Sequence, residues 1–381
     1  MTSQDPSAGP SRPAAARSHL PGLDALRFFA ASVVMLGHAH FSIQKLGIAR
    51  ASDLNILYMG REAVDFFFTL SGFLITYLLL RERERRAKID LKAFYMRRIL
   101  RIWPLYFLVL GIGFVVLGVL VPAVLGQTYF QFPNVWTGFL LFVFFLPNLA
   151  VSLYPVGLLT PLWSIGIEEQ FYLAWAPIFR ALRRPWIAAI VAIVIFCGLS
   201  VANELEWLGL ERGGKAFVAT LSFQCMAVGA LFGHWLFYGR EHYQQSIWAS
   251  RPAQVAVIAL ILCHFVFRIP FPLIAVNDLV MSTLYGLLIL QLSVNTRRIL
   301  QLEIEPLRYL GTISYGIYML HMVVDYAMRF AVQRLPMQVS PSIMVPAYYI
   351  TLSVLTIAVA AVSHRTYEAW FLRRKTAWSR S

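Results

Sequence analysis

Long apolar runs recur along the chain between residues 24 and 364, separated by segments that contain charged residues, Gly or Pro. A helix needs about 20 mainly apolar residues to cross a bilayer. Ten runs of roughly this length occur at 24–44, 63–80, 96–121, 162–180, 186–203, 216–238, 252–270, 276–295, 311–333 and 343–364. The pattern predicts an all-α, polytopic membrane helix bundle with about ten transmembrane helices.

One further run, at 135–150, is short and interrupted by Pro147. If it crosses the membrane fully, Arg180, Arg183 and Arg184 lie on the outer side; if it is a re-entrant or half-depth segment, they lie inside. The second interpretation gives the more uneven distribution of charge, so we favour it. Irregular backbone at membrane depth must be buried in protein or line a wet cavity, which makes this segment a first indication of a cavity.

Basic residues are distributed unevenly between the two sides of the predicted bundle. With the re-entrant interpretation, 25 of the 33 Lys and Arg residues lie on the inner side. The outer side keeps Lys45, Arg50, Arg61, Arg212, Lys215, Arg268, Arg329 and Arg334. Cytoplasmic loops of membrane proteins carry an excess of Lys and Arg. We therefore predict a multi-pass protein of the cell's inner (plasma) membrane with both termini in the cytoplasm.

The composition excludes several classes of protein. Of the 381 residues, 59% are hydrophobic and 14% charged, whereas soluble domains are about 45–50% apolar and about 25% charged. An ordinary cytosolic enzyme and a disordered chain are therefore excluded. The net charge of +14 does not indicate a nucleic-acid partner, because the Lys and Arg residues cluster between apolar runs. Cys197, Cys225 and Cys263 stand singly in apolar runs, which favours core positions over disulfides or metal ligands.

The two ends of the chain differ from the apolar middle. Residues 1–20 are rich in Pro, Ser, Ala and Arg and lack an apolar core of the signal-peptide kind, so we predict a disordered cytoplasmic tail. Residues 21–366 form the predicted transmembrane domain. Residues 367–381 are predicted to be a basic cytoplasmic tail.

Ionisable side chains inside a bilayer are costly and are functional candidates by default. Arg27 and His38 lie eleven residues apart in the first run, which is close to three helical turns and about 16 Å, so they point to the same side. Arg97, Arg98 and Arg101 can converge on one side of the third predicted helix, and guanidinium groups suit phosphate. The simpler alternatives are snorkelling for Arg27, a hydrogen-bonded core position for His38, and a positive-inside anchor for the arginine cluster.

Three further spans, the second, the fourth and the ninth, carry polar residues at depth. Ser71 and Gly72 indicate close helix packing. Glu168 and Glu169 follow each other on a helix, so they point about 100° apart and have different roles. We expect one of them to pair with an arginine or histidine and the other to face the cavity; a purely structural ion pair is the alternative.

His321 is predicted to lie at nearly the same depth as His38, because it is ten residues from the inner end of its run. Asp325 follows one turn later on the same face and could orient the His321 imidazole.

Together these segments resemble the acyltransferase family 3 membrane proteins. The matching pieces, in the expected order from residue 22 to about 321, are Arg27 and His38 in an Arg-x10-His pattern, DFFFTLSGFLI at 65–75, Arg98 and Arg101 in an Arg-x-x-Arg pattern, LWSIGIEEQFYL at 162–173 and ISYGIYMLH at 313–321. Each piece is short, and the five in register carry the resemblance.

The resemblance implies an enzyme that takes an acyl group, usually acetyl, from coenzyme A on the cytoplasmic side and transfers it to a hydroxyl of a carbohydrate or related acceptor. It implies His38 as catalytic histidine, Arg27, Arg98 and Arg101 as conserved arginines, and Ser164 with Glu168 as a Ser-x-x-x-Glu element. Ser71 and Tyr315 lie in the matching pieces, and we expect them, with Ser164, His321 and Asp325, to support the site.

We expect neutral His38 to act as general base, since an ordinary imidazole pKa of about 6.5 suits that task. Arginines at the inner mouth, Arg97 included, would hold the coenzyme A phosphates, and Glu168 or Glu169 would orient the base or the acceptor hydroxyl.

The sequence has no metal-ligand cluster, Gly-rich phosphate loop or Ser-centred nucleophile elbow. We therefore expect direct transfer from acyl-coenzyme A as a donor substrate, without a bound cofactor or metal.

The acceptor stays open: envelope polysaccharide, a lipid-linked sugar, an oligosaccharide signal and a macrolide-type antibiotic all fit. The chain ends shortly after the tenth run, so acceptor recognition is expected within the bundle rather than in an extra domain. RTYEAWF at 365–371 departs from the family pattern because no proline follows the Tyr-Glu pair two residues later, which leaves Glu368 without an assigned role.

Two other classes of function compete with the enzyme. In a transporter or flippase for a glycan or lipid-linked substrate, the same buried charges would form a proton or substrate path. No inverted repeat is visible in the sequence, but a re-entrant segment and midplane histidines suit a carrier. The second alternative is a membrane sensor or scaffold without chemistry.

Overall fold

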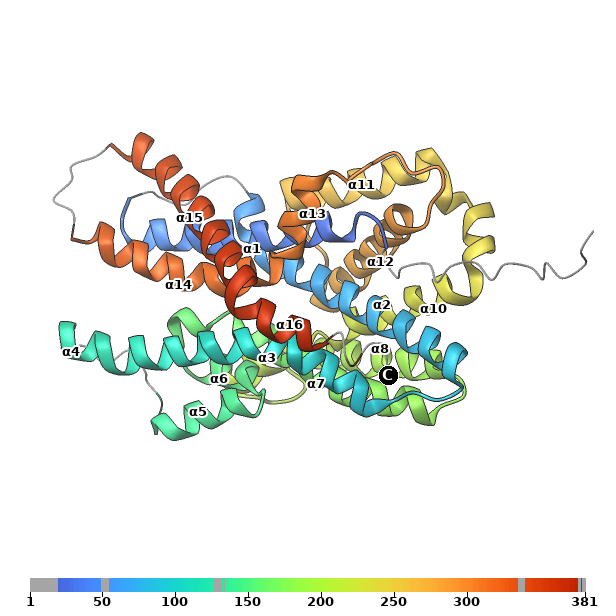
Figure 1. Cartoon of the computed structure of the whole chain (residues 1–381), viewed down its shortest axis with the longest axis horizontal. Helices are drawn as coiled ribbons and strands as arrows, with labels where there is room; N and C mark the ends of the chain where they lie inside the picture. The colour runs from blue at the N-terminus through green and yellow to red at the C-terminus, as the bar shows by residue number, and fades with distance from the viewer. Residues whose placement is uncertain are drawn as a thin grey trace, which may run out of the picture.

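The computed structural model describes residues 20–48, 55–126, 132, 134–334, 340–375 and 378, and the disordered tail predicted at 1–20 lies almost wholly outside them. Within these ranges the chain is helical and has no strand (Figure 1). The α-helices are α1 Leu23–Lys45, α2 Gly60–Arg86, α3 Leu91–Val115, α4 Val121–Leu125, α5 Val135–Val143, α6 Pro147–Leu153, α7 Leu162–Ala181, α8 Pro185–Glu204, α9 Arg212–Thr220, α10 Phe223–Gln245, α11 Arg251–Phe267, α12 Ile274–Ser293, α13 Glu305–Thr312, α14 Ser314–Val332, α15 Pro341–Ser363 and α16 Ala369–Lys375.

Each of the ten predicted spans falls on helical segments of the structure, so the polytopic helical bundle is confirmed. In the described part of the chain, seven helical segments are long and apolar enough to cross a membrane. They are Leu23–Lys45, Gly60–Arg86, Leu91–Val124, Pro185–Glu204, Arg212–Gln245, Ile274–Ser293 and Pro341–Lys375. Of the other three predicted spans, α11 has only 17 residues, and α7 and α14 carry buried polar groups such as Glu169 and Asp325. A total of ten crossings therefore stays a prediction.

The run at 135–150 is broken, as its proline predicted. It forms α5, of nine residues, and α6, of seven, with a turn at 144–146. A nine-residue helix is only about 13 Å long, less than half the thickness of the hydrocarbon core. Phe145 lies in the left-handed region, with φ 56°. Its ring packs on Tyr106 at 4.8 Å between centroids, and its carbonyl accepts a hydrogen bond of 2.8 Å from Gln170 Nε2. This broken segment is therefore fastened to α3 and α7.

Close packing is confirmed at Gly72, in the contact of α2 with α10, whereas the Ser71 hydroxyl faces α7 and donates to Glu168. A Cβ atom added to Gly72 would overlap the carbonyl oxygen of Met226, and one added to Gly229 would overlap that of Thr69. Gly233, one turn further along α10, similarly faces Phe73. Small residues four apart let two helix backbones approach closely, and here they bring α2 and α10 into contact along the centre of the bundle.

The C-terminal segment continues the last helix beyond the predicted domain boundary at 366. A π-helical turn, His364–Glu368, joins α15 to α16, which lies against α3 (Figure 1). The Tyr367 hydroxyl donates to the Pro104 carbonyl at 3.1 Å, and Arg97 Nη1 donates to the Trp378 carbonyl at 3.1 Å. Residues 367–375 are therefore packed on the bundle rather than forming a separate tail.

Candidate active site

One cavity lies between α1, α2, α3, α7 and α14, and we call it the arginine cavity. Its polar lining consists of Arg27, Arg98, Arg101, Glu168 and hydroxyl groups. The complete lining is Arg27, Val64, Phe67, Phe68, Ser71, Leu74, Ile75, Arg98, Arg101, Ile102, Ser164, Ile165, Glu168, Tyr172, Ser314, Tyr315 and Tyr318. It therefore gathers most of the residues that the sequence singled out.

Glu168 is held inside the arginine cavity by two hydroxyl groups. Ser71 Oγ donates to its Oε1 and the Tyr172 hydroxyl to its Oε2, both at 2.9 Å. The Arg98 guanidinium carbon lies 5.5 Å from the centre of the Tyr172 ring. Arg27 lines the same cavity and donates to Asp24 at 3.0 Å. Three guanidinium groups thus face one carboxylate across the cavity, which leaves its lining with a positive charge.

Glu169 points away from the arginine cavity, as expected for adjacent helical residues. Its Oε2 accepts a hydrogen bond of 2.9 Å from Trp103 Nε1 on α3, and the side chain is buried. The expected ion pair of either glutamate with an arginine or histidine is not found among the described residues. The two glutamates instead accept hydrogen bonds from hydroxyl and indole donors.

A second, strongly basic cavity adjoins the first and is called the basic vestibule. Its lining is Leu78, Leu79, Arg81, Glu82, Arg85, Arg86, Phe94, Arg97, Arg98, Arg101 and Lys375. Arg98 and Arg101 line both cavities, so the two are neighbours there. Arg97 lines only the vestibule and donates to Glu82 at 2.9 Å. The predicted convergence of three arginines therefore holds for Arg98 and Arg101, while Arg97 is directed outward.

His38 lines a third cavity, the histidine cavity. The lining is Val34, Gly37, His38, Phe41, Leu57, Tyr58, Gly60, Arg61, Val64, Pro161, Trp163 and Tyr318. His321 lies behind His38, with 3.1 Å between His321 Nε2 and His38 Nδ1. The two histidines that the sequence placed at equal depth are thus in direct contact.

The hydrogen bonds around the histidine pair fix the tautomer of each ring. His321 Nδ1 lies 2.6 Å from the Tyr318 carbonyl oxygen, which can only accept, so Nδ1 carries the proton and Nε2 accepts. His38 Nδ1 faces this Nε2 and the Val34 carbonyl, both at 3.1 Å, and must be the donor. Within the part of the chain that is described, His38 Nε2 has no partner, so its lone pair is available in the histidine cavity.

Asp325 does not orient His321, contrary to the sequence-based expectation. Its Oδ2 accepts a hydrogen bond of 2.6 Å from Ser42 Oγ and its Oδ1 one of 2.8 Å from the Tyr348 hydroxyl. Helical side chains lean toward the N-terminus, which takes the His321 ring to the carbonyl of Tyr318 and away from Asp325. Asp325 instead ties α14 to α1 and α15.

Tyr318 stands between the arginine and histidine cavities. It lines both, as does Val64. Its hydroxyl lies 2.7 Å from Ser164 Oγ, and the Tyr315 hydroxyl donates to the Ile102 carbonyl at 2.8 Å. Ser164 and Tyr315 thus lie in the arginine cavity, as expected of supporting residues. Sequence reasoning missed Tyr172 and Tyr318, although their spacing of four from Glu168 and three from His321 placed each on the face of a chosen residue.

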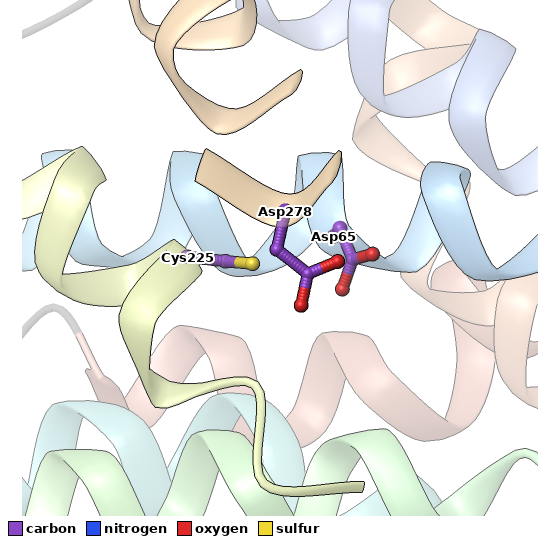
Figure 2. Close-up of side chains that lie close together, drawn as sticks. All are labelled: Asp65, Cys225 and Asp278. Atoms are coloured by element: carbon purple, nitrogen blue, oxygen red, sulfur yellow. The ribbon is translucent and has the colours of Figure 1, made fainter. Parts of the chain in front are cut away.

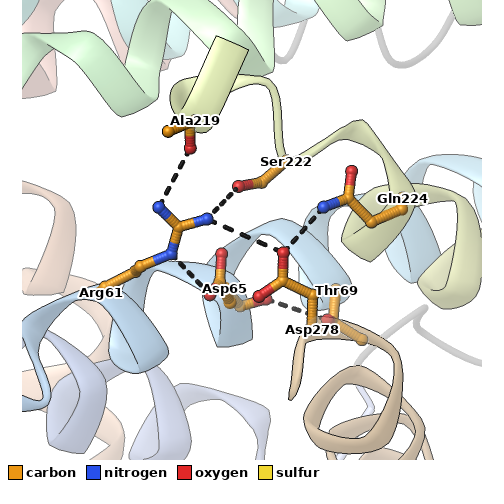
Figure 3. Close-up of polar contacts among 7 residues, drawn as sticks. All are labelled: Arg61, Asp65, Thr69, Ala219, Ser222, Gln224 and Asp278. Carbon is orange, nitrogen blue, oxygen red and sulfur yellow. Dashed lines mark hydrogen bonds and ion pairs between the residues drawn. The ribbon is translucent and has the colours of Figure 1, made fainter. Parts of the chain in front are cut away.

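A buried polar cluster adjoins the histidine cavity and was not predicted. Figure 2 shows Asp65, Cys225 and Asp278, from α2, α10 and α12, with ligand atoms within 4.8 Å of one another. Arg61 lies against the two carboxylates, with Nε 3.8 Å from Asp65 Oδ2 and Nη2 3.7 Å from Asp278 Oδ2 (Figure 3). Because this cation already faces both acids, the group is better suited to hold Arg61 than a metal ion.

Glu368 is buried near the end of α15. Its Oε1 accepts a hydrogen bond of 2.9 Å from Ser363 Oγ, and His364 Nδ1 lies 3.9 Å from its Oε2. These contacts are local to the turn into α16.

The amino-acid sequence of the chain is similar to those of known proteins. A family model described as an acyltransferase domain matches residues 20–365. The peptidoglycan O-acetyltransferase OatA of Listeria monocytogenes is 28% identical over 325 residues, 80% of this chain and 49% of that protein. The putative peptidoglycan O-acetyltransferase YrhL of Bacillus subtilis is 28% identical over 323 residues, 80% of this chain and 48% of that protein. The acyltransferase MdmB of Streptomyces mycarofaciens is 31% identical over 199 residues, 49% of this chain and 47% of that protein. The chain spans about half the length of these relatives, and no solved structure matches it.

Proposed function

Because the chain belongs to acyltransferase family 3, we propose that it transfers an acyl group, in the first instance acetyl, from coenzyme A to a hydroxyl of a carbohydrate or glycosylated acceptor. Two relatives are named for the O-acetylation of peptidoglycan, and a third is named an acyltransferase. An envelope carbohydrate is therefore the acceptor that we favour, ahead of a lipid-linked sugar or a macrolide.

The donor side of the proposal is supported by charge. Seven basic side chains and one carboxylate line the vestibule, and three arginines and one carboxylate line the cavity that adjoins it. Coenzyme A carries a diphosphate and a 3′-phosphate, which guanidinium groups bind through paired hydrogen bonds. We assign these phosphates to the vestibule and its junction at Arg98 and Arg101. The pantetheine arm, roughly as long as half a bilayer, then carries the thioester toward Tyr318.

The chemical step needs a base on the acceptor side, and His38 Nε2 supplies it in this proposal. The acceptor hydroxyl gives its proton to Nε2 as its oxygen attacks the thioester carbon. The C–S bond then breaks, and the imidazolium returns the proton to the leaving thiolate to give free coenzyme A. His321, which accepts the Nδ1–H of His38, keeps the lone pair on Nε2. Glu168 holds the Ser71 and Tyr172 hydroxyls on the donor side, and Glu169 has no part in the step.

One observation carries the proposal: the arginine cavity and the histidine cavity share Tyr318 and Val64. A donor anchored at Arg98 and an acceptor beside His38 would therefore meet at a common boundary. Binding two reactants at adjacent sites in a fixed orientation supplies much of the rate enhancement of a transfer reaction.

The first test is turnover of acetyl-coenzyme A by purified protein in a sugar-free zwitterionic detergent, where no membrane gradient exists. We expect release of free coenzyme A, and acetyl transfer from isotope-labelled donor to added peptidoglycan fragments, detected by mass spectrometry. A transporter needs two compartments and would show neither. Intact acetyl-coenzyme A after prolonged incubation with monodisperse protein would contradict the enzyme proposal and favour the carrier.

A further inference from the structure

Arg61 is a polar group in the histidine cavity that the proposed reaction leaves unused. It lies in the first turn of α2, and its side chain is 36% exposed. His38, from α1, lines the same cavity. A guanidinium group that shares a cavity with the proposed base can contact the molecule whose hydroxyl that base deprotonates.

Contacts with three helices hold Arg61 in place (Figure 3). Its Nη1 donates to the Ala219 carbonyl at 3.0 Å, and its Nη2 reaches Ser222 Oγ at 3.5 Å. The ion pairs with Asp65 and Asp278 are longer, at 3.8 and 3.7 Å, and Gln224 Nε2 fixes Asp278 Oδ2 at 2.7 Å. A guanidinium has five N–H donors. Only one short hydrogen bond is formed among the described residues, so donors remain for a ligand.

The charges around Arg61 decide which kind of ligand it accepts. Two carboxylates face a single guanidinium, and Oδ1 of each carboxylate has no hydrogen-bond partner among the described residues. The positive charge of Arg61 is therefore already matched within the cluster, which leaves no net positive charge to attract an anionic group. By contrast, three guanidinium groups and one carboxylate line the arginine cavity. The arginine cavity thus suits a phosphorylated donor, and the histidine cavity suits an uncharged acceptor.

The rest of the lining fits an uncharged sugar ring. Phe41, Tyr58, Trp163 and Tyr318 contribute aromatic surface to the histidine cavity. The negative face of an aromatic ring packs well against polarised C–H groups such as those on one face of a pyranose. A pocket that is mostly apolar, with a few polar groups to orient its ligand, is the usual form of a small-molecule site.

We propose that the histidine cavity is the acceptor subsite and that it binds an uncharged sugar, with Arg61 donating hydrogen bonds to a hydroxyl near the one that His38 deprotonates. Asp65 and Asp278 position Arg61 and neutralise its charge, so an acceptor with a carboxylate or phosphate near the reacting hydroxyl gains no ion pair there. This inference rests on the proposed function and adds to it the acceptor's charge and the residues that select it.

The test compares two acceptors that differ in one carboxylate, p-nitrophenyl β-glucoside and p-nitrophenyl β-glucuronide, with labelled acetyl-coenzyme A as donor in the same detergent. We expect kcat/KM for the glucoside to exceed that for the glucuronide at least tenfold. In Asp278→Asn this preference should fall at least tenfold, because Arg61 then loses a counter-charge and the cluster becomes more positive. Glu241 is an exposed carboxylate near the C-terminal end of α10. Glu241→Gln is the matched control and should keep the preference.

Arg61→Gln provides a second variant at the accessible edge of the cluster, should Asp278→Asn fail to fold. We expect it to raise the KM for the glucoside about tenfold with little effect on the KM for acetyl-coenzyme A, and Arg61→Lys to recover only part of the loss. Equal or better use of the glucuronide by the natural sequence would overturn the inference, as would an unchanged preference in folded Asp278→Asn. Hydrolysis of acetyl-coenzyme A with transfer to neither glycoside would overturn the acceptor subsite alone, whereas no turnover of the donor would overturn the proposed function.

Discussion

Replacing His38 with Gln should reduce acyl transfer at least 100-fold while leaving coenzyme A binding unchanged. A positioned general base contributes roughly 10²–10⁴-fold to a rate, and a glutamine amide cannot take the acceptor proton. The glutamine can still donate to His321 Nε2, which accepts from His38 Nδ1 at 3.1 Å. The fold should therefore survive, whereas His38→Ala removes this contact as well. Steady-state transfer rates and coenzyme A affinity, measured on monodisperse protein, give the two readouts.

The matched control for His38 is His234 on α10. Both side chains are half-buried, but His234 belongs to none of the three cavities described above. His234→Gln should keep transfer within about twofold, as expected of a substitution away from the site. Full activity in His38→Gln would show that His38 is not the general base. An equal loss in both variants would show that the effect is not specific to His38.

Replacing Arg98 with Gln should weaken coenzyme A binding about ten- to a hundredfold. A hydrogen bond to a charged group contributes about 1.5–3 kcal/mol, and 1.4 kcal/mol corresponds to a factor of about ten. Arg98 lines both the vestibule and the arginine cavity, so its loss removes one of the two guanidinium groups at their boundary. Charge reversal in Arg98→Glu should weaken binding further. Equilibrium binding of coenzyme A at two salt concentrations measures the effect, which high salt should reduce.

A phosphate-free donor separates phosphate recognition from other effects of this substitution. Acetyl-pantetheine carries the same thioester but none of the phosphates, so the transfer rate from it should differ little between the natural sequence and Arg98→Gln. Arg240→Glu, an exposed basic position on α10 outside the three cavities, should leave coenzyme A affinity unchanged. Equal affinity of Arg98→Gln and the natural sequence for coenzyme A would contradict the phosphate assignment.

Features that depend on one helix could be predicted from the sequence. The spacing of Arg27 and His38 fixes their separation along α1. Counting from the end of its run placed His321 at the depth of His38, and the contact between the rings agrees with that depth. The divergence of Glu168 and Glu169 follows from helical geometry alone. The break in the segment 135–150 followed from Pro147, although the turn itself is set by the packing of Phe145 on Tyr106.

Features that depend on several helices could not be predicted. Asp325 is paired by Ser42 on α1 and Tyr348 on α15, residues that share no pattern with it in the sequence. The difference between Arg97 and Arg101 depends on Glu82 and on α16, which packs against α3. The Arg61 cluster joins α2, α10 and α12, and Asp278 on α12 must be placed beside Arg61 and Asp65 on α2 before its charge balance can be seen. Which residue on another helix a side chain pairs with depends on how the helices pack, and the sequence pattern of one helix does not contain that information.

The most direct test of the central claim, that the vestibule and the histidine cavity serve one reaction, is photolabelling with an acyl-coenzyme A whose short acyl chain carries a diazirine. After irradiation of the purified protein, mass spectrometry identifies the labelled helices. We predict labels on α14 around Tyr318 and on α1 around His38, suppressed by excess acetyl-coenzyme A. Labels confined to α8, whose surface is largely exposed apolar side chains, or labels that excess donor does not suppress, would contradict the account.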